Sequence, residues 1–135
     1  MQIAEATRAQ RPGLVLSAAV IAYADRAYLS LAQDWRGWLA SGAIDLAIPM
    51  VYTLDDRLFG YQLESFAGLP HADRIWPGVG VWLFETAPVR ARGQLARVRS
   101  IGFRGEVLFS DDAIAAAPEL RAGLAETMAP GGANP

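Results

Sequence analysis

The chain has 135 residues, of which 53% are hydrophobic and 19% charged, a balance typical of one globular domain rather than of a disordered segment. The formal net charge of −2 provides no basic surface for nucleic acid. The lack of cysteine and the single histidine exclude disulfides, thiolate metal sites and a histidine-cluster metal site within one chain. We therefore expect no metal and no other cofactor.

The first segments along the chain are predicted to be a helix and a buried strand. Residues 1–10 mix alanines with charges, which indicates a helix that ends at Arg11-Pro12-Gly13. Residues 14–23 form a nearly continuous apolar run, typical of a strand that is buried on both faces of a parallel sheet. This run is too short to span a bilayer, and no secretion signal is visible. We expect no membrane span, and the compartment stays undetermined.

After the first strand, helical and strand-like segments alternate about every 30 residues. Leu31, Trp35 and Trp38 are spaced for one helix face, and Gly42 is suited to end that helix. Such alternation defines βαβ units, whose strands pair in parallel through right-handed crossovers. The expected helices cover residues 28–41, 55–68, 88–100 and 112–125, and the further strands cover residues 44–53, 74–84 and 106–110.

Four consecutive parallel βα units of the α/β class predict half of a (β/α)8 TIM barrel, because a complete barrel needs about 200–250 residues. We place this half-barrel domain at residues 1–126 and a disordered tail at residues 127–135. The alternative is an open, doubly wound sheet, but no Gly-x-Gly-x-x-Gly turn follows the first strand. Gly78-Val79-Gly80 lies inside an expected strand instead.

Three motifs in chain order carry a family resemblance. They are Gln33-Asp34-Trp35 with Trp38, Gly42, Asp45 and Pro49-Met50-Val51-Tyr52-Thr53; Trp76-Pro77-Gly78-Val79-Gly80; and Leu108-Phe109-Ser110-Asp111-Asp112. The chain thereby resembles the bacterial glycosyl-hydrolase-like family 10 proteins, whose catalytic domain is a TIM barrel. The resemblance implies that the four strands are the fifth to eighth of that barrel and that its first half lies outside this chain. Val51 and Asp111 depart from the family pattern near the expected substrate.

Candidate site residues follow from the barrel, because its chemistry gathers at the C-terminal ends of the strands. Glycoside hydrolysis uses two carboxyl groups that flank the bond to be cleaved. The candidate catalytic residues are Glu85, Asp25 and Asp112, whose structural alternatives are respectively a loop acid, a salt bridge with Arg26 and a helix N-cap. The candidate substrate-binding residues are Tyr52, Thr53, Trp82, Ser110 and Tyr23.

Several conspicuous residues have a structural interpretation instead. Trp35 and Trp38 are predicted to pack their helix against the sheet. Pro49 cannot donate to a ladder, so it predicts an edge strand or a β-bulge. Asp45 begins its strand and His71 lies in a loop, which places both at the N-terminal, stabilising end of the strands.

These patterns predict a partial glycoside-hydrolase-like domain that acts on or binds carbohydrate and is inactive as an isolated fragment. Enzymatic activity then requires the missing half. The alternative is a non-catalytic glycan-binding or self-associating structural half-barrel, because a half-barrel leaves two unpaired edges and an uncovered inner face. The expected partners are a carbohydrate, and either a second copy of the chain or the missing half-barrel.

Overall fold

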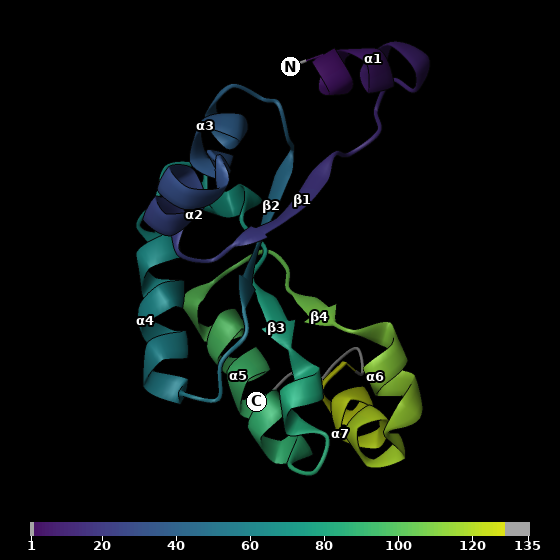
Figure 1. Cartoon of the computed structure of the whole chain (residues 1–135). Coiled ribbons are helices and arrows are strands. Elements are labelled where there is room, and N and C mark those ends of the chain that lie inside the picture. The colour runs from purple at the N-terminus through teal and green to yellow at the C-terminus, as the bar shows by residue number, and fades with distance from the viewer. Residues whose placement is uncertain (1, 129–135) are drawn as a thin grey trace.

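The computed structural model describes residues 2–128 (Figure 1). The strands are β1 (Ser17–Ile21), β2 (Leu46–Val51), β3 (Gly78–Gly80) and β4 (Val107–Phe109). The helices are α1 (Gln2–Gln10), α2 (Ala24–Leu31), α3 (Trp35–Ala40), α4 (Asp56–Ala67), α5 (Pro88–Ile101), α6 (Asp111–Ala116) and α7 (Pro118–Met128), with the 3-10 turns η1 (Ala72–Arg74) and η2 (Val81–Phe84). No helix within residues 2–128 is both long and apolar enough to cross a membrane.

The four strands form one parallel sheet in the order β1-β2-β3-β4. Ser17 of β1 lies beside Leu46, and Met50 of β2 lies beside Gly78. Gly78 in turn lies beside Val107 of β4. Helices separate consecutive strands, so the α/β class and the parallel βα repeat predicted from the sequence are confirmed.

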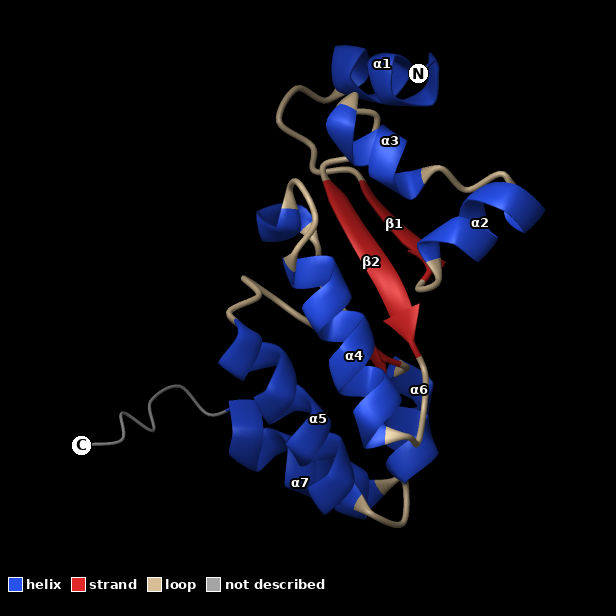
Figure 2. Ribbon diagram, turned by 90° about the vertical axis from the view of Figure 1, so that its left-hand side faces the viewer, coloured by secondary structure: helices blue, strands red, loops and turns tan. Residues whose placement is uncertain are grey.

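One face of this sheet is covered by helices. In Figure 1, α3, α4 and α5 lie on the same side of the strands, and Figure 2 looks onto that side. The strand side chains that face these helices are fully buried with the apolar stripes of the helices, and they are Val20, Ala47, Val51 and Val79. The residues that alternate with them lie on the opposite face, where Ala19 is exposed and Ile48 and Met50 are partly exposed. We call this opposite side the open face.

Helix α4 shows how residue spacing and capping in the sequence predict an element correctly. Phe59, Leu63 and Phe66 recur at helical spacing, and all three are buried against the sheet. The carboxylate of Asp55 accepts hydrogen bonds from the backbone N–H groups of Arg57 and Leu58, which caps the helix start. The helix expected at residues 55–68 is therefore found, one residue shorter at each end.

The single helix expected at residues 28–41 is wrong, because two helices occupy this region. Helix α2 ends where Ala32 adopts a left-handed conformation with φ of 53°. The side chain of Gln33 then accepts a hydrogen bond from the backbone N–H of Ile21 (3.1 Å), and Asp34 caps α3 by accepting from Gly37 (3.1 Å). Trp35 packs edge-on against Phe66 with ring centroids 6.1 Å apart, as a packing residue should.

Several other predicted bounds are also too long. The strands expected at residues 14–23, 44–53 and 106–110 are each shorter in the structure, and residues 81–84 of the strand expected at 74–84 form the turn η2. The helix expected at residues 112–125 is divided at Ala117, because Pro118 begins a new helix. Residues 127 and 128 of the expected tail belong to α7, and residues 129–135 lie outside the described residues.

Pro49 was expected to mark an edge strand or a bulge, and it marks neither. It lies in β2, which is paired on both sides, and its partner in β1 is Val20. Ala47 bridges Ile75 and Met50 pairs with Gly78, so the register toward β3 is the same before and after the proline. Continued between these pairs, that register sets Pro49 opposite Pro77.

Asp45 holds the N-terminal helix to the start of the sheet. One carboxylate oxygen accepts the backbone N–H of Leu16 (2.8 Å) and the other accepts from Arg8 of α1 (2.9 Å). Arg8 also donates to the carbonyl of Gly42 (2.8 Å). The Leu16 hydrogen bond and, after it, the Arg8 guanidinium lower the pKa of Asp45, against the opposing effect of burial. These contacts show how Asp45 performs the structural role predicted for it: it joins α1 to the start of the sheet.

We expect Asp45→Asn to lower the free energy of unfolding at pH 7 by roughly 1 kcal/mol, because both partners are more than a third exposed and solvent screens the pair. The folded pKa lies below the ordinary value of 3.8, so this contribution is present above that value and is lost as the pH falls through the folded pKa. Urea unfolding of the unsubstituted chain and of Asp45→Asn at pH 7 and pH 3 measures this contribution. The difference in the free energy of unfolding between the two proteins should be smaller at pH 3, and an unchanged difference would contradict an effect of the ionised carboxylate.

Candidate functional site

Three aromatic side chains meet on the open face where the strands end. The ring of Tyr52, directly after β2, lies edge-on to Trp82 of η2 with centroids 4.6 Å apart. It also lies edge-on to Phe109, the last residue of β4, at 5.4 Å. Trp82 remains 37% exposed, and the other two rings are partly buried. We call these three residues the aromatic surface.

Two glycines of β3 make room for the aromatic surface. A Cβ atom added at Gly78 would meet the ring of Phe109 at 3.2 Å. One added at Gly80 would meet the ring of Trp82 at 2.8 Å and that of Tyr52 at 3.1 Å. Glycine inside a strand commonly marks such a close approach, so Gly78-Val79-Gly80 acts as a backbone floor under the rings. Phe109 was not among the candidate residues, although it lies one residue before the end of an expected strand.

Tyr52 combines an apolar ring with a polar edge. Burial raises the pKa of its hydroxyl to about 12, so this group stays protonated at neutral pH and can donate a hydrogen bond. Aromatic side chains of this kind offer a flat apolar surface together with a polar edge. Tyr52 and Trp82, both predicted to bind substrate, are therefore brought together by the structure.

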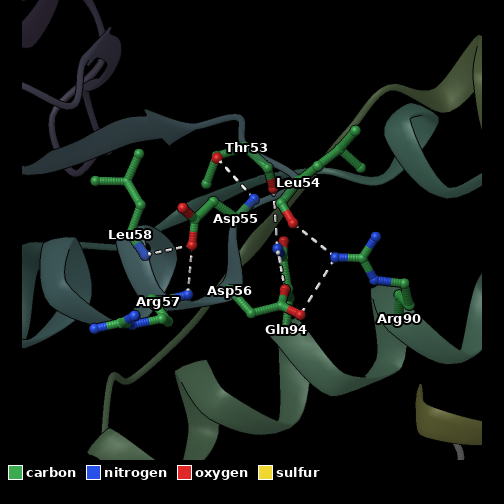
Figure 3. Close-up of polar contacts among 8 residues, drawn as sticks. All are labelled: Thr53, Leu54, Asp55, Asp56, Arg57, Leu58, Arg90 and Gln94. Atoms are coloured by element: carbon green, nitrogen blue, oxygen red, sulfur yellow. Dashed lines mark hydrogen bonds and ion pairs between the residues drawn. The ribbon is translucent and has the colours of Figure 1, made fainter.

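Thr53, also a predicted substrate-binding residue, is instead used by the local fold. Its hydroxyl accepts a hydrogen bond from the backbone N–H of Asp55 (3.0 Å), two residues later. Its carbonyl oxygen accepts from the side chain of Gln94 in α5 (3.0 Å). Figure 3 shows both contacts in the connection between β2 and α4. Thr53 therefore fixes the position from which Tyr52 projects.

The same connection is held by a polar network that the sequence analysis missed. Gln94 is buried and donates to the carboxylate of Asp56 (3.1 Å) as well. Arg90 donates to the carbonyl of Leu54 (2.6 Å) and to Asp56 (3.3 Å) (Figure 3). The available signal was one polar residue, Gln94, within the apolar stripe of α5. A buried amide of this kind normally has a partner to find.

Ser110 and Asp112 follow β4 and begin α6. The hydroxyl of Ser110 donates to the carboxylate of Asp112. This bond and, after it, the backbone N–H of Ala113 lower the pKa of Asp112. An acid catalyst needs a raised pKa, so the contacts of Asp112 do not favour a proton-donating role. Its structural alternative, a helix N-cap, is wrong as well, because Ser110 is the N-cap of α6 and Asp112 lies in the first turn.

The other two candidate acids lie apart from each other. Asp25 pairs with Arg36 of α3 (2.9 Å) rather than with Arg26. With Tyr23 it lines a cavity of about 590 Å³ on the helix-covered side, and neither Glu85 nor Asp112 contributes to this cavity. Glu85 directly follows η2, is exposed, and pairs with no basic side chain within residues 2–128. The three acids therefore do not line one cavity.

Within residues 2–128, no three histidine or acidic side chains lie close enough together to hold a metal ion. We also compared the chain with known protein families, with curated proteins and with solved structures, and none of the three comparisons finds a match. The motifs that resemble the glycosyl-hydrolase-like family therefore remain the basis for a proposal.

Proposed function

We propose that this chain is the C-terminal half of a glycoside-hydrolase-like (β/α)8 barrel and binds carbohydrate on the aromatic surface. The observation that carries the proposal is the meeting of Tyr52, Trp82 and Phe109 at the C-terminal ends of parallel strands. Chemistry in such barrels is located at that end. Aromatic rings with a polar edge fit the apolar faces and hydroxyl groups of sugar rings.

The sheet order supports a barrel half over a doubly wound sheet. The order β1-β2-β3-β4 never reverses, and α3, α4 and α5 lie on one side only (Figures 1 and 2). A doubly wound sheet reverses its strand order and carries helices on both faces. Parallel sheets are almost always covered on both faces, so the open face is suited to become the inside of a closed barrel.

The catalytic part of the proposal assigns the reaction to a completed barrel. Hydrolysis needs two carboxyl groups within about 5–10 Å of each other. Asp25 is paired with Arg36 and Asp112 is engaged by Ser110, which leaves Glu85 as the unpaired candidate beside η2. We propose that Glu85 works with an acid supplied by the other half, so the isolated chain binds glycans without cleaving them.

Trp82→Ala tests the carbohydrate proposal. We expect the chain to bind at least one soluble oligosaccharide among β-1,4-linked glucose, xylose and N-acetylglucosamine series, and the substitution to weaken that binding about tenfold, because a lost stacking face costs about 1 kcal/mol or more. Isothermal titration calorimetry measures the change. Tyr28→Ala is the matched control, since Tyr28 is an exposed aromatic residue on α2. Equal affinities of the two variants, or no binding by the unsubstituted chain, would contradict the proposal.

The open face and unpaired edges favour a second candidate, a self-associating half-barrel. A two-fold axis along the barrel pairs β4 of each copy with β1 of the other and keeps all eight strands parallel. We then expect a sedimentation coefficient that rises with protein concentration, and Ala19→Glu on the open face to abolish the rise, while Leu29→Glu on α2 leaves it unchanged. A monomer at every concentration would exclude self-association.

A further inference from the structure

A second candidate site lies on the helix-covered side, away from the aromatic surface. It is the cavity of about 590 Å³ bounded by the end of β1, by α2 and α3, and by α4. Its volume lies in the range of small-molecule sites, about 300–1,000 Å³. Tyr23 and Tyr61 contribute exposed rings to its lining, and Ala22 and Phe66 connect it to the core.

The side chain of Gln62 adds a polar group to the lining of this cavity. Gln62 lines the cavity and is only 6% exposed. Within residues 2–128 its side chain makes no hydrogen bond. Its amide atoms are not among the fully buried atoms without a partner, which are Trp35 Nε1 and Gln94 Oε1, so the amide of Gln62 is reached by solvent. A ligand with a hydrogen-bonding group can bond to this amide in place of solvent.

The charges around the cavity leave one cation available. Arg26, Arg36 and Asp25 all line it, and Arg36 is paired with Asp25 (2.9 Å). No carboxylate within residues 2–128 lies at ion-pair distance from Arg26. Two arginines against one aspartate give the lining a net charge of +1. A guanidinium group binds carboxylates through two parallel hydrogen bonds.

We propose that this cavity binds a small, singly charged aromatic carboxylate. Arg26 pairs with the carboxylate, the rings of Tyr23 and Tyr61 contact the aromatic body, and Gln62 bonds to a polar substituent of the ring. This site is independent of the proposed carbohydrate function, because it shares no residue with the aromatic surface and lies on the other side of the sheet.

The test is a calorimetric and NMR titration of the full chain with 4-hydroxybenzoate, and with 4-hydroxybenzamide as its neutral counterpart. We expect 4-hydroxybenzoate to bind and the amide to bind about tenfold more weakly, since a charged hydrogen bond is lost. Arg26→Gln should reduce the affinity for 4-hydroxybenzoate about tenfold and remove the preference over the amide. Gln62→Leu should weaken binding of both probes.

Two controls separate this site from the others. Arg11→Gln, in the exposed turn after α1, should leave the affinity unchanged, and so should Trp82→Ala on the aromatic surface. Urea unfolding of Arg26→Gln and Gln62→Leu verifies that each variant is folded, and loss of binding in a folded variant supports the site. Absence of binding at millimolar 4-hydroxybenzoate, equal affinity for the two probes, or loss of binding in Trp82→Ala would overturn the proposal.

Discussion

Leu63→Ala is expected to lower the free energy of unfolding by about 2–5 kcal/mol, the largest effect predicted for this chain. Leu63 lies on α4 and is 0% exposed, packed in the core between that helix and the sheet. Truncation removes buried apolar contacts and leaves a cavity, because the surrounding side chains relax only in part. Urea unfolding followed by circular dichroism measures the change.

The loss is large relative to the stability available. Domains unfold at a cost of about 5–15 kcal/mol, and here only one face of the sheet is covered by helices (Figure 1). Leu29→Ala is the matched control, since Leu29 is 79% exposed on α2 and the same atoms are removed. It should change the free energy by about 0.5 kcal/mol or less. Equal losses at both positions would show that α4 does not depend on this packing.

The sequence predicted those elements whose local and tertiary signals agree. Phe59 and Leu63 have helical spacing, Asp55 is a good cap, and the structure buries the first two and uses the third as a cap. The apolar run around Val51 likewise became a central parallel strand. In each case the local sequence pattern and the packing in the folded chain favour the same element.

Other features depend on contacts between distant segments, which no local pattern contains. The break between α2 and α3 depends on Gln33, whose side chain reaches back to the backbone of Ile21. The shortness of β3 follows from Pro77, which has no N–H to pair, and from the turn that begins at Val81. Apolar residues at Val79 and Val81 satisfy a strand pattern although only the first belongs to a strand.

The candidate site was likewise predicted only in part from the sequence. Tyr52 and Trp82 were predicted as strand-end residues, and the structure brings their rings together. Tyr23 and Asp25 also follow a strand, but the chain turns into α2 there and both line a cavity on the helix-covered side. A position after a strand identifies the end of the sheet, whereas the path of the next few residues decides the face.

Gly80→Ala is expected to weaken glycan binding about tenfold and to lower the free energy of unfolding by about 1–3 kcal/mol, as overpacking does. Gly80 has φ of −80°, which alanine adopts freely, so the cost is steric. The added Cβ would lie 2.8 Å from a ring carbon of Trp82 and 3.1 Å from one of Tyr52. Both rings must move, and the proposed sugar-binding surface changes shape.

Gly93→Ala is the control, and we expect it to change the free energy of unfolding in the opposite direction. Gly93 lies within α5, and a Cβ added there meets no atom within 4 Å. Alanine is the better helix former by about 1 kcal/mol, so this variant should be more stable and bind glycans as before. Urea unfolding measures the stability of both variants, and calorimetric titration measures their affinity for glycans. If Gly80→Ala retained full stability and affinity, the rings would not depend on the glycine floor, and the aromatic surface would have to form in another way.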